Sequence, residues 1–210
     1  MEADWEVEIG AESPVIDVAW SGFVELQQNP DRIDEISESR GFPCLAAALL
    51  SLNAQTTFPG DQNELVLQTV KCDLWPTGPC DPSEMDATPD TSGCGIACYI
   101  DLVPRNRGFF PSLLAAESWA RLITSHLKMR LSPASRVDLI VRQAVTLANS
   151  GFGITAYISA CGATMESSKH ALGTALEVFT ETISNTKNPS QAQSAPAMNA
   201  ENDTMTTAGE

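Results

Sequence analysis

A short passage occurs twice in this chain, and this repeat limits the folds open to it more than any other feature. The segment Gly95–Ile100 (GIACYI) returns as Gly153–Ile158 (GITAYI), and Arg40–Pro43 (RGFP) is matched by Arg107–Pro111 (RGFFP). The Phe-Pro pairs are 68 residues apart, whereas the Gly-Ile pairs are 58 apart. The first copy therefore holds about ten extra residues between these marks, and the stretch 76–93 supplies them. The repeat predicts one structural unit that is present twice.

Hydrophobic periodicity predicts that each copy is an α-β-β unit. Apolar residues at helical spacing indicate helices over 43–53, from Phe110-Pro111 to before Pro133, and over about 164–184, with Thr164 as N-cap. Runs rich in Val, Ile, Leu and Tyr indicate strands at 15–20, 65–75, 95–103, 136–145 and 152–160, and residues 5–9 are a further strand that could pair with 15–20. Four prolines predict a long loop over Pro76–Gly93.

The resulting element order, β-α-β-β-α-β-β-α, resembles a ferredoxin-like split β-α-β sandwich with one further strand and helix. This resemblance implies an α+β fold with an antiparallel sheet and helices on one face, and it implies nothing about function. We expect one domain over 1–184, with repeat units at about 40–103 and 107–160 and a capping helix at about 164–184. Residues 185–210 contain no aromatic, Val, Ile or Leu residue and are expected to form a disordered tail.

The charge of the chain is unevenly distributed. The formal net charge is −15, and residues 1–90 alone account for −15, while 91–184 carry +2 and 185–210 carry −2. An acidic first half argues against nucleic acid or an anionic membrane as the partner, because phosphates repel it. The stretch Arg105–Arg142 is basic, and we expect it to face the acidic half within the monomer or in a dimer. The alternative is a site for an anion or an acidic partner.

The same sequence contains no sign of membrane insertion or export. No apolar run approaches the 18 or more residues that a membrane span requires. The first residues, Met1–Glu6, are acidic and lack the basic and apolar regions of a secretory signal, so a cytoplasmic location is expected. In a reducing cytosol the six cysteines are expected to be free thiols.

Strand alternation predicts which side chains share a face of the sheet. The residues that alternate with the apolar ones form an outer face that mixes aromatic and charged groups, and its candidate binding residues are Trp75, Tyr99, Asp101, Asp138, Arg142, Tyr157 and Cys161. Aromatic rings offer flat apolar surface, and the neighbouring charges can form charge-assisted hydrogen bonds. This face suits recognition. The alternatives are a face paired by internal salt bridges and one covered by a partner subunit.

No motif in the chain indicates catalysis, a metal or a cofactor. Cys94 and Cys98 would lie about 13 Å apart on one strand, too far to share a zinc ion. Cys161 ends a strand before a helix N-terminus, which favours a thiolate, but no suitable histidine base accompanies it. Phosphate-binding glycine loops, dinucleotide fingerprints and serine nucleophile motifs are lacking. We therefore expect no catalytic residue, no metal ligand and no cofactor.

These observations predict a soluble, non-enzymatic binding or assembly module that uses its outer face to hold a protein partner or to form a homo-oligomer such as a homodimer. The alternative is a small-molecule enzyme on the same face, with Asp73, Asp101, Asp138 and Arg142 as its working residues. An enzyme site should be concave, whereas an assembly face should be flat.

Overall fold

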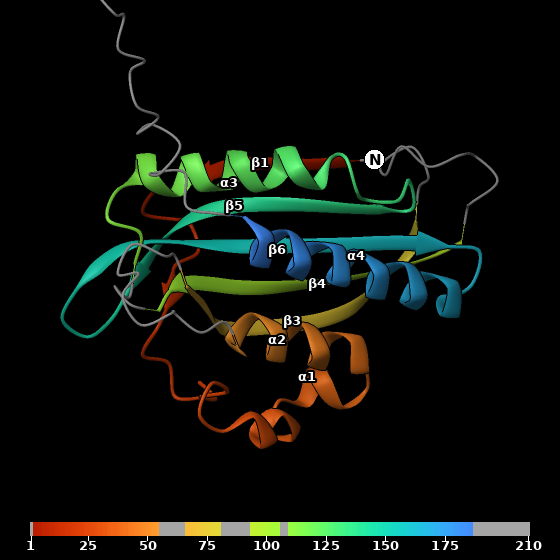
Figure 1. Ribbon diagram of the computed structural model, residues 1–210, viewed down its shortest axis with the longest axis horizontal. Coiled ribbons are helices and arrows are strands. Elements are labelled where there is room, and N and C mark those ends of the chain that lie inside the picture. The colour runs from red at the N-terminus through yellow and green to blue at the C-terminus, as the bar shows by residue number, and fades with distance from the viewer. Residues whose placement is uncertain (1, 55–65, 81–92, 106–108, 187–210) are drawn as a thin grey trace, which may run out of the picture.

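The computed structural model describes residues 2–54, 66–80, 93–105 and 109–186, which form a six-stranded sheet with helices packed on one side (Figure 1). The strands are β1 (Glu2–Glu8), β2 (Ile16–Asp17), β3 (Leu67–Cys80), β4 (Gly93–Pro104), β5 (Ser135–Val145) and β6 (Ser150–Gly162). The helices are the 3-10 helix η1 (Pro30–Glu35), α1 (Ser37–Arg40), α2 (Pro43–Ala54), α3 (Leu113–Leu127) and α4 (Met165–Asn185). The α+β class predicted from the sequence is confirmed.

The sheet is mixed, so the prediction of an antiparallel sheet is wrong at one edge. The strand order is β1-β5-β6-β4-β3, in which β1 runs parallel to β5 and the other three pairs are antiparallel. The predicted pairing of residues 5–9 with 15–20 is also wrong, because β1 and β2 both lie along β5 in the parallel direction. A hairpin would have reversed the chain, whereas here β5 pairs with both segments in turn.

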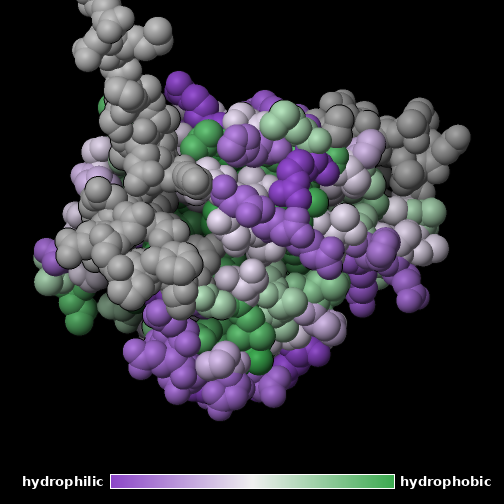
Figure 2. All heavy atoms as spheres, in the orientation of Figure 1, coloured by the Kyte–Doolittle hydropathy of each residue, from purple (hydrophilic) through white to green (hydrophobic). Residues whose placement is uncertain are grey.

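The core lies between the sheet and the helices α2, α3 and α4. Each of these helices buries one stripe against the inner face of the sheet, and in Figure 2 the exposed side of α4 is hydrophilic. The inward residues of the three central strands are fully or almost fully buried, as the alternation predicted: Cys98, Ile100 and Leu102; Val137, Leu139 and Val141; Ile154, Ala156 and Ile158. None of α2, α3 and α4 lies on the opposite side of the sheet, which is the outer face.

Strand β3 extends further than the prolines of this region predicted. We expected a loop from Pro76 onward, but β3 continues through Pro76 and Pro79 to Cys80, and β4 begins at Gly93. A proline cannot donate a backbone hydrogen bond, and it is tolerated here because β3 is an edge strand with only one neighbour. The rest of the predicted loop, 81–92, lies outside the described residues.

Helix α4 begins where the sequence predicted. The Thr164 side chain accepts a hydrogen bond from the Ser167 backbone N–H at 3.2 Å, and the Ser167 hydroxyl accepts one from the Thr164 N–H at 3.0 Å. This reciprocal capping box satisfies two backbone donors that the first helical turn leaves unpaired. The tail predicted beyond this helix lies, from residue 187 onward, outside the described residues. Among the helices that the structure describes, none is long and apolar enough to span a membrane.

Candidate functional site

The strand register aligns acidic and aromatic side chains in one row across the outer face. Tyr99 of β4 lies directly opposite Tyr157 of β6. Asp73 of β3 is the other neighbour of Tyr99, and Asp138 of β5 is the other neighbour of Tyr157. Asp4 of β1 extends the row beyond Asp138. We call Asp73, Tyr99, Tyr157, Asp138 and Asp4 the cross-strand row; two rings lie at its centre and carboxylates at both ends.

Trp75 joins the two tyrosines to form a compact cluster, the aromatic triangle (Trp75, Tyr99 and Tyr157). The ring centroids are 6.2 Å apart for Trp75 and Tyr99, 6.5 Å for Trp75 and Tyr157, and 5.8 Å for the two tyrosines. The planes are inclined to one another by 48° to 79°, within the range of favourable aromatic pairs. All three rings are half-buried. The structure thus brings together the three aromatic residues that the alternation placed on this face.

A buried polar relay lies beside the aromatic triangle. Arg142 donates a hydrogen bond to the Thr155 hydroxyl at 3.3 Å, and Thr155 donates one to the Asp101 carboxylate at 2.6 Å. Arg142 also pairs with Glu8 at 2.6 Å, and its guanidinium carbon lies 5.5 Å from the centroid of the Tyr157 ring. Asp101 and Arg142 are each only 8% exposed. Strand alternation predicts that Asp101 and Arg142 share the outer face, but it does not indicate that Thr155 connects them.

Burial controls the protonation of this relay. Removal from solvent raises the pKa of Asp101, and the hydrogen bond from Thr155 together with the charges of Arg142 and Lys71 offsets only part of that effect. Burial likewise raises the pKa of Tyr99. The Tyr99 hydroxyl is a hydrogen-bond partner of Lys71 and raises the pKa of that ammonium group. The folded protein therefore holds the Asp101 charge at a cost in stability.

We expect Asp101→Asn to stabilise the protein by an amount that grows with pH. Because the folded pKa of Asp101 lies above its unfolded value, the folded state retains the proton longer, and wild-type stability falls as pH rises from about 4 through the folded pKa. Asparagine has no charge to bury and can still accept the hydrogen bond from Thr155. The measurement is urea unfolding of both proteins between pH 4 and pH 8.

Thr155→Val is the companion variant for this prediction. It removes the hydroxyl that lowers the Asp101 pKa, so the loss of stability with pH should extend to a higher pH than in the wild type. A destabilisation of Asp101→Asn that increases toward pH 8 would contradict the prediction, since it would show that the charged carboxylate is favoured in the fold.

Strand β1 adds a line of carboxylates to the outer face that sequence analysis overlooked. Residues 2–8 read E-A-D-W-E-V-E, and the acidic residues Glu2, Asp4, Glu6 and Glu8 all pair in register with outward positions of β5. A strand was predicted only at residues 5–9, and the strict alternation of acidic and apolar residues was the signal that could have identified its start at Glu2 and its outward side. The partner strand, however, could not be inferred from the alternation.

Part of this charge is neutralised within the chain. Arg136 pairs with Glu2 at 2.7 Å and with Asp138 at 2.6 Å, and Arg142 pairs with Glu8. For these two arginines, the expectation that the basic stretch faces the acidic half of the monomer is confirmed. Within the described residues, Asp4, Glu6 and Asp73 form no ion pair. These three carboxylates are also exposed to solvent.

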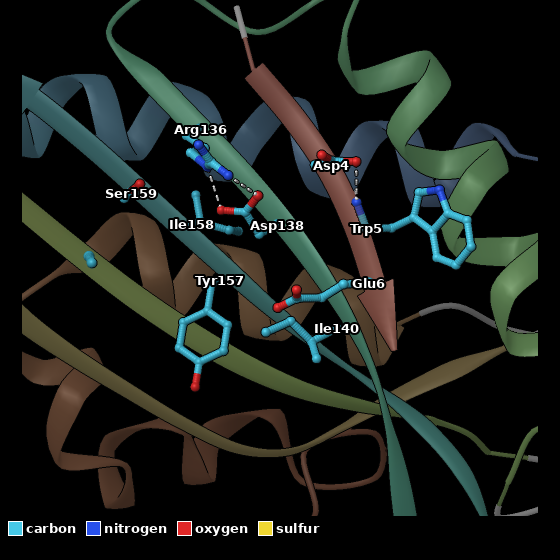
Figure 3. Close-up of a pocket in the computed structure, with 10 residues that line it drawn as sticks. Asp4, Trp5, Glu6, Arg136, Asp138, Ile140, Tyr157, Ile158 and Ser159 are labelled. Carbon is cyan, nitrogen blue, oxygen red and sulfur yellow. Dashed lines mark hydrogen bonds and ion pairs between the residues drawn. The ribbon is translucent and has the colours of Figure 1, made fainter. Parts of the chain in front are cut away.

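A hollow on the outer face connects two of the unpaired carboxylates, Asp4 and Glu6, to Tyr157 of the aromatic triangle. It has a volume of about 410 Å³ and its lining includes Asp4, Glu6, Arg136, Asp138 and Tyr157. Figure 3 shows the hydrogen-bonded pair formed by Arg136 and Asp138, with Glu6 on the β1 side of the hollow and the ring of Tyr157 on the other side. The hollow therefore presents carboxylate oxygens at one side and an aromatic ring at the other.

Three of the residues selected from the sequence, Cys161, Asp73 and Asp138, do not fit one active centre. Cys161 is 1% exposed, so its thiol is not accessible on the outer face. Asp138 lies three strands away from Asp73 in the cross-strand row, a separation of about 14 Å at the usual strand spacing. These two carboxylates cannot act on one reacting atom. Nor do the described residues contain a cluster of three or more side chains able to hold a metal ion.

Comparison of the chain with protein-family models, curated proteins and solved structures found no match. The function must therefore be inferred from the geometry and charge of the outer face.

Proposed function

We propose that this protein is a non-enzymatic binding module that captures a basic segment of a protein partner on its outer face. The observation that carries the proposal is the cross-strand row, in which two half-buried tyrosine rings lie between the exposed carboxylates of Asp73 and Asp4, with the half-buried Asp138 beside Tyr157. Aromatic rings attract cations through their negative faces, and carboxylates attract them by charge. A segment rich in Lys or Arg can make both kinds of contact at once.

The balance of charge on the outer face supports a basic partner. The acidic residues on this face outnumber the basic ones: Glu2, Asp4, Glu6, Glu8, Asp73, Asp101 and Asp138 face Lys71, Arg136 and Arg142. Both arginines already pair with carboxylates of the chain. A second copy of this face would bring like charges together, so charge favours a basic partner over a homodimer formed through this surface.

The internal repeat supplies a reason for the paired tyrosines. We propose that the α2-β3-β4 and α3-β5-β6 segments are two copies of one α-β-β unit, arranged in ferredoxin-like order with α4 as the additional helix. In support, Tyr99 and Tyr157 occupy the same position in the repeated passages GIACYI and GITAYI, and they are direct neighbours across β4 and β6. A duplication would place two equivalent rings side by side.

The first test uses a synthetic 12-residue Gly/Ser peptide with four lysines, with a peptide of the same length carrying four glutamates for comparison. We expect the protein to bind the lysine peptide in a calorimetric titration at low salt and to ignore the glutamate peptide. Binding should weaken between 50 and 300 mM NaCl, because exposed charges are screened over about 10 Å at 0.1 M salt. The absence of binding at low salt would overturn the proposal.

A pair of variants separates the outer face from the overall charge of −15. Glu6→Gln/Asp73→Asn removes two exposed, unpaired carboxylates of the outer face and is expected to weaken lysine-peptide binding about tenfold, since each exposed pair contributes roughly 0.2–1 kcal/mol. Glu166→Gln/Glu177→Gln makes the same change in net charge on α4 and should bind almost as the wild type does. Equal weakening in both variants would show that net charge, and not this face, attracts the peptide.

A further inference from the structure

We infer that the aromatic triangle is a subsite for a methylated ammonium group, carried by a methylated lysine within the basic segment of the partner. This inference rests on the proposed function and assigns one side chain of the bound segment to a defined place on the outer face.

The dimensions of the aromatic triangle suit one cation held by three rings. The centroids are 5.8, 6.2 and 6.5 Å apart, so a point above the middle of the triangle lies within about 6 Å of all three. That distance is the usual limit of a cation–π contact, and a cation gains most from the rings whose faces it overlies. The rings pack against one another before binding, so little conformational entropy remains to be lost.

The charges around the triangle favour a bound cation. Asp73 lies one strand away from Tyr99 and provides an exposed negative charge, whereas Asp138, one strand away from Tyr157, is already paired with Arg136. Arg142 already lies 5.5 Å from the Tyr157 centroid, which shows that this ring accepts a cation, and its ion pair with Glu8 offsets its repulsion of a second one. Lys71 is a hydrogen-bond partner of Tyr99 and adds a positive charge beside the triangle. The charges of Asp73 and Asp101 act on Lys71 and offset its repulsion of a bound cation.

Methylation determines whether an ammonium group prefers the rings or the carboxylates. An unmodified lysine is strongly hydrated and carries three hydrogen-bond donors, so it is best satisfied by Asp4 or Glu6, which are exposed and unpaired among the residues described. A trimethylated ammonium has no donor and a larger apolar surface but keeps its positive charge. The half-buried aromatic triangle offers apolar surface with a negative potential, which matches that combination.

The size of the acidic surface points to a protein side chain as the source of this group. The cross-strand row extends from β3 to β1, and Glu6 of β1 adds a further exposed carboxylate. A free methylammonium compound such as choline would occupy the aromatic triangle and leave the carboxylates of β1 unused. A peptide places further lysines over these carboxylates while its methylated lysine contacts the rings.

The experiment compares three forms of the 12-residue lysine peptide that differ at one central position: lysine, trimethyllysine, and a neutral analogue with a tert-butyl group in place of the trimethylammonium. We expect trimethyllysine to lower the Kd about tenfold relative to lysine, and the neutral analogue to bind no better than lysine because cation–π attraction requires the charge. In Trp75→Leu the ratio of the lysine and trimethyllysine Kd values should fall to about one. In Leu114→Ala, an exposed change on α3, it should stay at about ten.

The outcomes separate this inference from the proposed function. Equal affinity for the lysine and trimethyllysine peptides would overturn the inference and leave the proposed function standing, whereas failure to bind any of the peptides would overturn both. A neutral analogue as tight as trimethyllysine would also contradict the inference, since it would show an apolar contact only. If choline binds as tightly as the trimethyllysine peptide, the methylated ammonium group need not be carried by a protein, and this part of the inference is wrong. Urea unfolding of each variant identifies any that fails to fold.

Discussion

Replacement of both Tyr99 and Tyr157 by alanine is expected to lower the affinity for the lysine peptide about 30-fold without unfolding the protein. The two rings form the centre of the cross-strand row, with centroids 5.8 Å apart, and we expect both to contact a bound cation. A cation–π contact contributes about 0.5–2 kcal/mol, so the loss of two is roughly 2 kcal/mol, which corresponds to the stated change in Kd. Calorimetric titration of the double variant measures it.

The matched control is Tyr99→Phe/Tyr157→Phe, which keeps both rings and removes only the hydroxyl groups. It should retain most of the affinity, because the attraction of a cation to phenylalanine is similar in kind. Both variants should remain folded because the tyrosines are half-buried on the outer face and do not belong to the core between sheet and helices. If the alanine variant is folded by circular dichroism and binds as tightly as the wild type, the two tyrosines are not part of the binding site.

The largest expected effect on stability comes from Phe179→Ala in α4. Phe179 is fully buried and belongs to the main core cluster, and its helix packs over β4 and β6, the strands that carry the two tyrosines. Truncation of a buried phenylalanine leaves a cavity and typically lowers the free energy of unfolding by about 3–5 kcal/mol. Urea unfolding followed by circular dichroism measures the change.

Leu147→Ala is the control for this second prediction, because Leu147 is a large apolar side chain that is 98% exposed. Its replacement should change the free energy of unfolding by less than about 0.5 kcal/mol, as for most surface substitutions. A change below about 1 kcal/mol for Phe179→Ala would be incompatible with a helix that is docked on β4 and β6. Such a result would show that α4 does not stabilise β4 and β6, the strands that carry the two tyrosines.

Much of the outer face was predictable because the alternation of a strand is a local property. Side chains of adjacent residues point to opposite sides of a sheet, so the burial of Ile100 and Leu102 requires that Tyr99 and Asp101 point outward. The same local rule applies to Asp138 and to Tyr157. Capping chemistry is equally local, which is why Thr164 was predicted correctly as the residue before α4.

The errors arose where a long-range neighbour decided the outcome. The loop expected from Pro76 became strand because β3 lies at the edge of the sheet, where a missing backbone donor is tolerated. Cys161 alternates with residues of β6 that point to the outer face, such as Tyr157, yet Cys161 is only 1% exposed in the folded chain. Neither the strand conformation at Pro76 nor the burial of Cys161 can be predicted from the neighbouring residues in the sequence.

Local sequence patterns were enough to predict the α+β class, the bounds of the central strands and helices to within a few residues, and the side of β3, β4, β5 and β6 that faces the core. Which outward side chains are neighbours depends on the three-dimensional arrangement of the strands. Glu2 lies 134 residues from Arg136 in the chain, and only the parallel pairing of β1 with β5 brings their charges together. The opposition of Tyr99 and Tyr157 likewise depends on the register of β4 and β6. The periodicity of a strand follows from its own backbone, whereas the choice of partner and register depends on the whole core.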